Sequence, residues 1–251
     1  MTDDLTRLRG LLDSTRLDRE PDDSAGYLDV LGDDGEQPRT VAGLAMRSGI
    51  VASIYQRGWR QGLNLAMGTG GLGPSEERRY AAESLELSKA SLVLDVACGP
   101  GNFTHVFASA VPQGGLVVGL DASRAMLAQA VTDNVVPGAA YLRADARHMP
   151  FADRTFDAIC CYAALYLVPE PFTVLTDMLR VLAPGGRIAL MTSYRGSWEP
   201  QRLARGALSV LSGVRMFEQG ELTGVLRSAG MVDIEQEIRG AVQFVNARRP
   251  L

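Results

Sequence analysis

The stretch that decides the fold is LVLDVACGPGNFT, residues 92–104. Its first six residues are an apolar run that predicts a buried strand, and the residues after the loop predict a helix. Gly99 and Gly101 let the backbone turn sharply between the two and let a ligand approach closely. Twenty residues past Gly101, Asp121 ends the apolar run LVVGL, where a carboxylate can accept both ribose hydroxyls of a nucleoside. The stretch therefore predicts a βαβ unit that binds a nucleoside-containing ligand.

From residue 91 onward, strand and helix patterns alternate. The first five predicted strands are separated by helical runs, which is typical of a parallel sheet covered on both faces. The last two are joined by a tight turn, which predicts an antiparallel hairpin at one edge. We predict an α/β fold with a Rossmann-like seven-stranded, mostly parallel sheet, one antiparallel edge strand, helices on both faces and an N-terminal helical extension. The predicted strands are Leu92–Ala97, Leu116–Leu120, Ala140–Arg143, Phe156–Cys161, Arg187–Thr192, Val232–Ile238 and Gln243–Ala247.

The sequence divides into three parts. Residues 91–251 form the predicted core. Residues 41–90 have a helical pattern, and we expect this segment, with Tyr55, to close over the cofactor as a lid. Residues 1–40 form an acidic extension with one short helix and a short strand within residues 26–32. Its low content of large apolar side chains is typical of a partly disordered tail, and a functional lid is the alternative.

A second glycine pattern in the sequence does not indicate a cofactor-binding loop. Gly68, Gly70 and Gly73 match the spacing of a dinucleotide-binding loop. The residues before them read as helix where that loop needs a strand, and the residue twenty positions past Gly73 is Val93, where the ribose needs an acid. We therefore interpret this stretch as a linker.

Two residues of the first loop distinguish between nucleoside cofactors. A dinucleotide loop would place its third glycine at Thr104, so the pattern is broken there. Asp95 lies in the strand that leads into the loop, and its carboxylate would repel a pyrophosphate because like charges in a low-dielectric cleft are costly. A carboxylate suits a ligand that carries an ammonium and a sulfonium and no phosphate. S-adenosyl-L-methionine is such a ligand, and its product would be S-adenosyl-L-homocysteine.

Several motifs resemble the class I S-adenosylmethionine-dependent methyltransferases, and among them the quinone C-methyltransferase-like group (methyltransferase type 11). The similarity extends from about Tyr55 to the C-terminus, and some uncharacterised bacterial and plastid members share its first pieces. It implies a methyltransferase fold and activity and does not specify a substrate. The motifs are IYQRGWRQ, GPSEERRY, DVACGPGNF, GLDAS, RADARHMPF, FDAICC, VLAPGGRIAL and EIRGAVQFVNARRP.

The loop chemistry and the resemblance together predict a cofactor site. Asp95 would attract the methionine ammonium, Asp121 would bind the ribose diol, and Asp145 would accept a hydrogen bond from the adenine amino group. The alternatives are a structural hydrogen bond for Asp95, a loop-solvating acid for Asp145 and ordinary core packing for the apolar members. The predicted cofactor-binding residues are Tyr55, Asp95, Ala97, Gly99, Gly101, Asp121, Ala122, Met126, Asp145, Ala146 and Cys161.

The reaction places few demands on catalytic side chains, because the cofactor brings an already activated methyl group and the protein mainly aligns the reactants. His105 and Tyr166 are the candidate bases, and Tyr166 stands where many relatives have histidine. Core packing is the alternative for the tyrosines. No metal site is expected, since the three cysteines form no CxxC pair. The predicted substrate-lining residues are Tyr162, Tyr166, Tyr194 and Trp198.

Composition limits the partners. A net charge of −4 argues against nucleic-acid binding, which needs a basic face. The apolar stretches are too short for a membrane span, and the N-terminus MTDDLTRLRG lacks the apolar core of a secretory signal. Three unpaired cysteines suit a reducing compartment, so we expect a cytoplasmic protein, as a monomer or homodimer.

These observations lead to three hypotheses of decreasing weight. The first is an enzyme that moves a methyl group from S-adenosylmethionine to an oxygen or carbon of a small organic acceptor: a lipid or quinone precursor, a phenolic natural product or a sugar. The second is a non-catalytic S-adenosylmethionine-binding protein of the same fold. The third is an NAD-dependent oxidoreductase.

Overall fold

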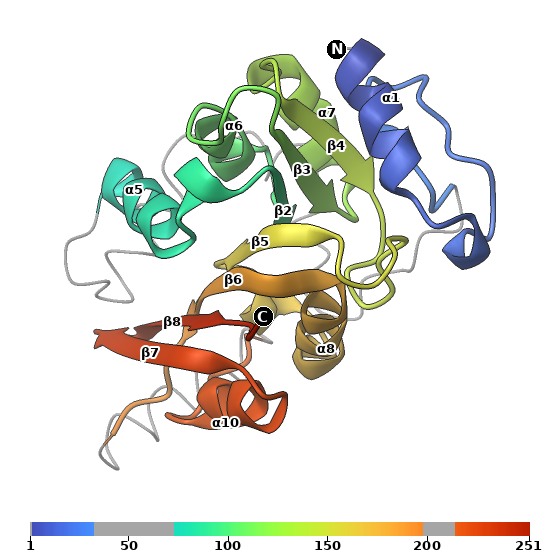
Figure 1. The fold of residues 1–251 in the computed structure, drawn as a ribbon. Helices are drawn as coiled ribbons and strands as arrows, with labels where there is room; N and C mark the ends of the chain where they lie inside the picture. The colour runs from blue at the N-terminus through green and yellow to red at the C-terminus, as the bar shows by residue number, and fades with distance from the viewer. Residues whose placement is uncertain (1, 33–72, 198–213) are drawn as a thin grey trace.

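The computed structural model describes residues 2–32, 73–197 and 214–251. A single eight-stranded sheet runs through them in the order β1-β4-β3-β2-β5-β6-β8-β7 (Figure 1). All neighbouring strands are parallel except at β8, which is antiparallel to both β6 and β7. The strands are β1 Leu28–Asp29, β2 Leu92–Val96, β3 Leu116–Asp121, β4 Ala139–Arg143, β5 Phe156–Tyr162, β6 Leu182–Ser193, β7 Val232–Arg239 and β8 Val242–Arg248.

The predicted α/β class and the seven predicted strands are confirmed, most of them to within one or two residues at each end. Two features differ from the prediction. The sheet gains β1 as an eighth strand, which lies within the short strand suggested for residues 26–32. β6 begins earlier than predicted, at Leu182, although Gly185 within it has a φ of +76° and its pairing with β5 is irregular between Phe156 and Ala158. The antiparallel strand of the hairpin, β8, lies between β6 and the edge strand β7.

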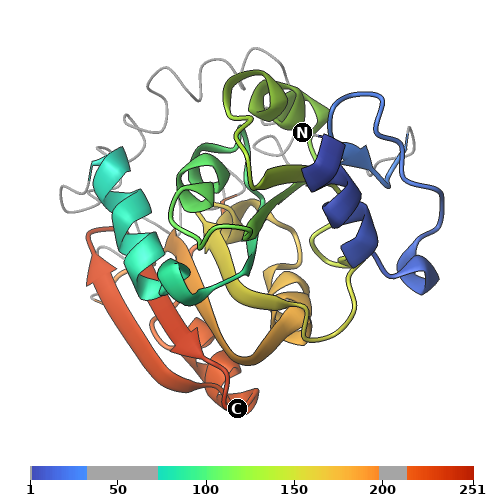
Figure 2. The ribbon, with the colours of Figure 1, turned by 45° about the horizontal axis from the view of Figure 1, so that its top comes forward.

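Helices cover both faces of the sheet, as predicted. Figure 1 shows α5 and α6 on one side of the central strands and α1 and α8 on the other. Figures 1 and 2 agree that α1 lies near β4, at the opposite end of the sheet from the β7–β8 hairpin. The described α-helices are α1 Thr2–Leu11, α5 Pro74–Ser84, α6 Asn102–Ala108, α7 Arg124–Asp133, α8 Pro171–Val181 and α10 Glu221–Ser228, with a short 3-10 helix, η4, at Leu165–Leu167.

The strand order creates a crevice at one edge of the sheet. The chain runs from β2 outward through β3 and β4 and then returns to β5 on the other side of β2. The chain continues from β2 to β3 on one side and from β5 to β6 on the opposite side. The carboxyl ends of β2 and β5 therefore form a topological switch point, where α/β proteins bind ligands. The glycine loop that follows β2 lies there. Val93, Leu94 and Ile159 beneath it are fully buried, so a continuous apolar core supports the loop.

Residues 2–32 pack on the core, whereas their composition was typical of a partly disordered tail. Leu8 on α1 and Leu28 on β1 are fully buried in the main core cluster. A carboxylate oxygen of Asp4 accepts a hydrogen bond from the backbone N–H of Gly138 at 3.0 Å, and Arg7 donates to the carbonyl of Gly114 at 2.7 Å. Helix α1 is therefore anchored to the loops that flank β3 and β4.

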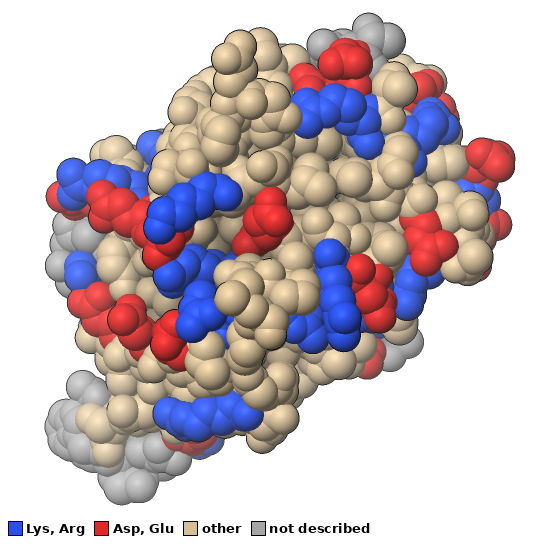
Figure 3. Space-filling model, viewed as in Figure 1, with Lys and Arg blue, Asp and Glu red and all other residues tan. Residues whose placement is uncertain are grey.

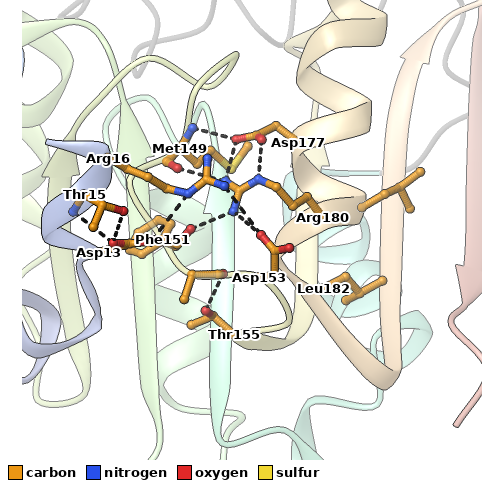
Figure 4. A network of polar contacts seen from close by, with 12 residues as sticks. Asp13, Thr15, Arg16, Met149, Phe151, Asp153, Thr155, Asp177, Arg180 and Leu182 are labelled. Carbon is orange, nitrogen blue, oxygen red and sulfur yellow. Dashed lines mark hydrogen bonds and ion pairs between the residues drawn. The ribbon is translucent and has the colours of Figure 1, made fainter.

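A second network ties this segment to α8 (Figure 4). Arg180 of α8 donates to the carbonyls of Phe151 at 2.7 Å and Met149 at 2.9 Å. Its guanidinium also pairs with Asp153 at 2.9 Å, and Arg16 of the N-terminal segment lies 3.6 Å from the same carboxylate. One arginine thus holds together the loop before β5, helix α8 and the N-terminal segment.

Candidate functional site

A cavity opens where β2 ends and α6 begins, at the predicted glycine loop. Gly99 has a φ of +56°, and a Cβ atom there would meet nothing within 4 Å, so its backbone borders open space. Gly101 has a φ of +81°, and a Cβ there would overlap the hydroxyl of Tyr141. The cavity is lined by Asp95, Ala97, Cys98, Gly99, Pro100, Asn102, Phe103, Asp121, Ser123, Met126, Tyr162, Ala163, Ala164, Leu167 and Val168.

Asp121 connects the two loops that border this cavity. Its Oδ2 accepts from the backbone N–H of Gly99 at 2.9 Å, and its Oδ1 accepts from the N–H of Ser123 at 2.8 Å. Ser123 in turn caps α7, because its hydroxyl accepts from the N–H of Met126 at 3.3 Å. An ionised carboxylate offers about four lone-pair sites. Asp121 therefore orders the two loops, and it also lines the cavity.

Asp95 is only 3 % exposed, at the base of the cavity. The hydroxyl of Thr104, which is fully buried on α6, donates to its Oδ2 at 2.7 Å. This bond explains why the residue at this position of the loop is a threonine and not a third glycine. Gly119 on β3 leaves room for the pair, since a Cβ there would lie 2.8 Å from the Thr104 hydroxyl. The carboxylate of Asp95 is therefore held in place by a specific donor.

The cavity does not suit a phosphate. Two carboxylates line it, and no lysine or arginine of the described residues does. Residues 99–101 of the loop also offer no free backbone N–H group of the kind that holds a phosphate. The N–H of Gly99 is bonded to Asp121, the N–H of Gly101 is bonded to the carbonyl of Cys98 at 3.1 Å, and Pro100 has no N–H. The residues present fit the ribose and the cationic centres of S-adenosylmethionine better than the pyrophosphate of a dinucleotide.

One wall of the cavity is apolar and contains a single buried hydroxyl. Ala163, Ala164, Leu167 and Val168 line this wall after β5. Tyr162 lies beside them, with its ring 5.3 Å from the ring of Phe103 and 6.0 Å from that of Phe244. Within the described residues, the Tyr162 hydroxyl is buried without a hydrogen-bond partner. Burial raises the pKa of this hydroxyl well above its usual range, so it stays protonated.

The structure brings part of the predicted site together. The predicted residues that line the cavity are Asp95, Ala97, Gly99, Asp121, Met126 and Tyr162. Those that are described but do not line it are Gly101, His105, Ala122, Asp145, Ala146, Cys161, Tyr166 and Tyr194. Tyr55, Gly68, Gly70 and Trp198 lie outside the described residues.

Asp145 is held by a neighbouring arginine. Arg147 donates from Nε to Oδ1 at 3.0 Å and from Nη2 to Oδ2 at 2.6 Å, and it also pairs with Glu170 at 3.1 Å. Burial alone would raise the pKa of Asp145, but the hydrogen bonds from Arg147 outweigh it and lower the pKa below its usual value. Both carboxylate oxygens thus serve an ion pair within the loop. Its role toward adenine stays a prediction.

The two candidate bases also lie away from the cavity. His105 follows the loop on α6, but its side chain is not part of the lining. Tyr166 is buried in η4, and its carbonyl accepts from the N–H of Arg215 at 2.9 Å. At this 3-10 turn, Ala164 and Leu167 line the cavity and Tyr166 does not. Cys161 points to the other face of β5 from Tyr162, because successive strand residues alternate.

Sequence reasoning missed nine lining residues. Pro100 lies between the two predicted glycines and three others lie within two residues of them, so closeness to Gly99 and Gly101 was the available signal. The signal was weaker for the apolar residues that follow β5, because only the tyrosines of that segment suggested contact with a ligand. The missed residues are Cys98, Pro100, Asn102, Phe103, Ser123, Ala163, Ala164, Leu167 and Val168.

Surface and metal features agree with a small-molecule site. Figure 3 shows lysine, arginine, aspartate and glutamate interspersed on the face it presents, without a large area of one sign. Within the described ranges, no group of three or more potential metal ligands is present. None of the helices in the described part of the chain is long and apolar enough to cross a membrane.

Comparisons with known proteins agree with this geometry. Residues 94–190 match the family model described as a methyltransferase domain. An uncharacterized methyltransferase of Synechocystis is 30 % identical over 77 % of this chain and 93 % of its own length. A chloroplastic uncharacterized methyltransferase of Arabidopsis thaliana is 32 % identical over 87 % of this chain, and the match spans 63 % of that relative. A second chloroplastic relative from the same plant is matched over 62 % of its length.

More distant matches point the same way. A demethylmenaquinone methyltransferase of Lactiplantibacillus plantarum is 36 % identical over 45 % of this chain and 50 % of its own length. The crystal structure of a putative methyltransferase from Bacillus halodurans superposes with a TM-score of 0.61 and 20 % identity, covering 70 % of this chain and 99 % of that one, which shows a shared fold. With the Synechocystis protein matched over nearly its whole length, this chain belongs to the methyltransferase family.

Proposed function

We propose that this protein transfers a methyl group from S-adenosylmethionine to a small organic acceptor. The observation that carries the proposal is the cavity at the switch point, where Asp95 and Asp121 face a space that no basic side chain of the described residues lines. When bound, S-adenosylmethionine supplies an electrophilic methyl group on a sulfonium. Asp121 accepts hydrogen bonds from the ribose hydroxyls, and Asp95 attracts the methionine ammonium.

The same residues explain how binding is made specific. Asp121 is already oriented by two backbone donors, and Asp95 is oriented by the Thr104 hydroxyl, so neither carboxylate needs to reorganise when the ligand arrives. Pre-ordered groups reduce the entropy cost of binding. Burial of Asp95 strengthens its attraction for a cation because little water competes. Alignment of the two reactants is then the main contribution of the protein to the rate.

The wall after β5 favours an apolar acceptor with one polar group. Four small or branched apolar residues, 163, 164, 167 and 168, supply contact area without hydrogen-bond capacity. The Tyr162 hydroxyl is the single buried donor beside them, and it would orient a hydroxyl or carbonyl of the acceptor. A quinone precursor or another phenolic compound has this character, whereas a sugar has many hydroxyls that such a wall would leave unpaired. The demethylmenaquinone methyltransferase among the relatives supports this choice.

We infer that none of the predicted bases removes a proton during the reaction. His105 and Tyr166 do not line the cavity, and the raised pKa of Tyr162 keeps its hydroxyl protonated near neutral pH. The acceptor would therefore react at an atom that is already nucleophilic, such as a phenolate oxygen or an electron-rich ring carbon. The free, buried state of the three cysteines is compatible with the cytoplasmic location we propose.

Methyl transfer is tested with the purified full-length chain and isotopically labelled S-adenosylmethionine. The acceptor panel contains a prenylated hydroquinone, an alkylphenol and a hexose. Label in the hydroquinone or the phenol supports the proposal. Saturable cofactor binding without label in any acceptor, including those of a cell extract, would favour a non-catalytic binding protein. Binding of NADH in place of the sulfur cofactors would favour an oxidoreductase.

The acceptor assignment is tested with two matched tyrosine variants. Tyr162→Phe should raise the KM for the acceptor and leave the affinity for S-adenosylhomocysteine unchanged, because only the hydroxyl at the apolar wall is lost. Tyr166→Phe, four residues away and outside the cavity lining, should leave both quantities unchanged. Equal effects of the two substitutions would overturn the role proposed for Tyr162.

A further inference from the structure

A buried arginine connects the N-terminal segment to the loop beside the cavity. Arg143, at the end of β4, is 4 % exposed. Its Nη1 donates to both carboxylate oxygens of Asp29, at 3.1 and 2.9 Å, and to the carbonyl of Gly32 at 2.6 Å. Its Nε donates to the carbonyl of Ala122 at 3.1 Å. A single planar guanidinium therefore joins Asp29 and Gly32, from residues 22–32, to Ala122.

Ala122 lies between two residues that line the cavity. It stands between Asp121, which we assign to the ribose, and Ser123, which caps α7. Both neighbours line the cavity, and so does Met126 in the first turn of α7. The Ala122 carbonyl is turned away from the cavity toward Arg143. Its direction sets the orientation of the peptide that joins Ala122 to Ser123. The N–H of that peptide donates to Asp121 Oδ1, so its orientation bears on the position of the ribose-binding carboxylate relative to α7.

The same N-terminal residues also contact α7. Arg124, the first residue of that helix, donates to the carbonyl of Gly32 at 2.8 Å and lies 3.5 Å from the carboxylate of Asp29. Asp29 additionally accepts from the backbone N–H groups of Leu31 and Gly32, at 2.9 and 3.0 Å. The turn at residues 29–32 is thus fixed by its own acid and is bonded to both ends of the loop from Asp121 to α7.

We propose that Arg143 is a positioning residue for cofactor binding, and that Asp29 makes the N-terminal segment a working part of the cofactor site. This inference rests on the proposed function, since it takes the cofactor to be S-adenosylmethionine. Asp29 neutralises a guanidinium that is almost completely buried, and removal of either partner would leave an uncompensated buried charge. Arginine is suited to this role because its fork binds a carboxylate and a carbonyl at once, in a fixed geometry.

The two ends of the guanidinium have different consequences. The bonds to Asp29 and Gly32 secure β1 against β4, which contributes to stability, and they hold the guanidinium in the orientation from which its Nε reaches Ala122. The bond to Ala122 acts on the cavity, which is a contribution to affinity. Arg143→Lys separates the two, because an ammonium at the end of a flexible chain can pair with Asp29 but cannot also present a second, fixed donor to Ala122. We expect this variant to recover stability and not affinity.

The test measures S-adenosylhomocysteine binding to the full chain by titration calorimetry, well below the melting temperature of every variant. Arg143→Gln and Asp29→Asn should each weaken binding by about tenfold or more, equivalent to one lost charged hydrogen bond. Arg180→Gln is the matched control. Arg180 bonds carbonyls and carboxylates of the core and shares the Asp153 carboxylate with Arg16 of the N-terminal segment, but none of its partners lines the cavity. Its loss should lower the melting temperature and spare affinity.

The outcomes separate this inference from the proposed function. If the wild-type chain binds neither S-adenosylmethionine nor S-adenosylhomocysteine, the proposed function fails, and the inference fails with it. If the wild type binds and the Arg143 and Asp29 variants bind equally tightly while folded, only the inference is overturned. Equal losses of affinity in Arg180→Gln would also overturn it, because the effect would then follow general stability. Weaker binding confined to the Arg143 and Asp29 variants supports it.

Discussion

Replacing Thr104 by valine tests how the cofactor loop is held together. The substitution keeps the shape of the side chain and removes one hydroxyl, which donates to Asp95 at 2.7 Å in a buried setting. A hydrogen bond to a charged group contributes about 1.5–3 kcal/mol to stability. In a protein of about this size, 1 kcal/mol shifts the melting temperature by roughly 2–4 °C. Thr104→Val should therefore melt roughly 3–12 °C lower than the wild type.

Thr132→Val is the matched control for this experiment. Thr132 also lies on a helix and bonds through its hydroxyl, to the Ala128 carbonyl at 2.8 Å, but it is exposed. A surface substitution of this kind changes stability by no more than about 0.5 kcal/mol. Thermal unfolding followed by circular dichroism compares the two variants with the wild type. If Thr104→Val melts within error of Thr132→Val, the Thr104–Asp95 bond does not hold the loop as we describe.

Three further predictions concern packing, thiol reactivity and pH. Gly119→Ala should destabilise the protein by about 1–3 kcal/mol in urea unfolding, because its Cβ would lie 2.7–2.8 Å from two buried side chains; an unchanged midpoint would contradict this packing. The three buried cysteines, Cys98, Cys160 and Cys161, should react with a thiol reagent only after unfolding, since burial also raises the pKa of Cys98 and Cys161; rapid labelling of the native protein would refute this. Burial would raise the pKa of Asp29, but hydrogen bonds from the Gly32 N–H and the arginine beside it lower it. The free energy of unfolding lost in Asp29→Asn should therefore be constant above the unfolded-state pKa of about 3.9 and should shrink as the pH falls below it. Urea unfolding at several pH values measures this loss. A loss that grows toward low pH would contradict the lowered pKa of Asp29.

The sequence predicted the sheet well because its strands carry strong local signals. Long apolar runs separated by helical patterns specify parallel, doubly covered strands. The two-residue strand β1 has too little periodicity to be certain without its partner β4, since pairing with an existing edge is what makes it a strand. The strand β6 was predicted to begin at Arg187, whereas it begins at Leu182 and passes through an irregularity at Gly185, whose φ is +76°.

The site was predicted in part, and the failures have physical reasons. Asp95 and Asp121 follow from the positions of strand ends, which sequence spacing fixes. Asp145 also follows a strand, but the arginine two residues later binds its carboxylate, and a sequence pattern does not report where a long flexible side chain folds back. No feature of the sequence distinguishes Tyr162 from Tyr166 as the tyrosine that lines the cavity. Tyr162 ends β5 and lines the cavity, whereas Tyr166 lies inside the following 3-10 turn and does not, and that turn has no clear sequence signature.

The most direct test of the central claim is titration calorimetry of the wild-type full-length chain with S-adenosylhomocysteine and, separately, with NADH. The carboxylate-lined cavity and the internally bonded glycine loop predict saturable binding of S-adenosylhomocysteine at a single site and no detectable binding of NADH. Binding of NADH, or the absence of binding by the sulfur cofactor, would contradict the account.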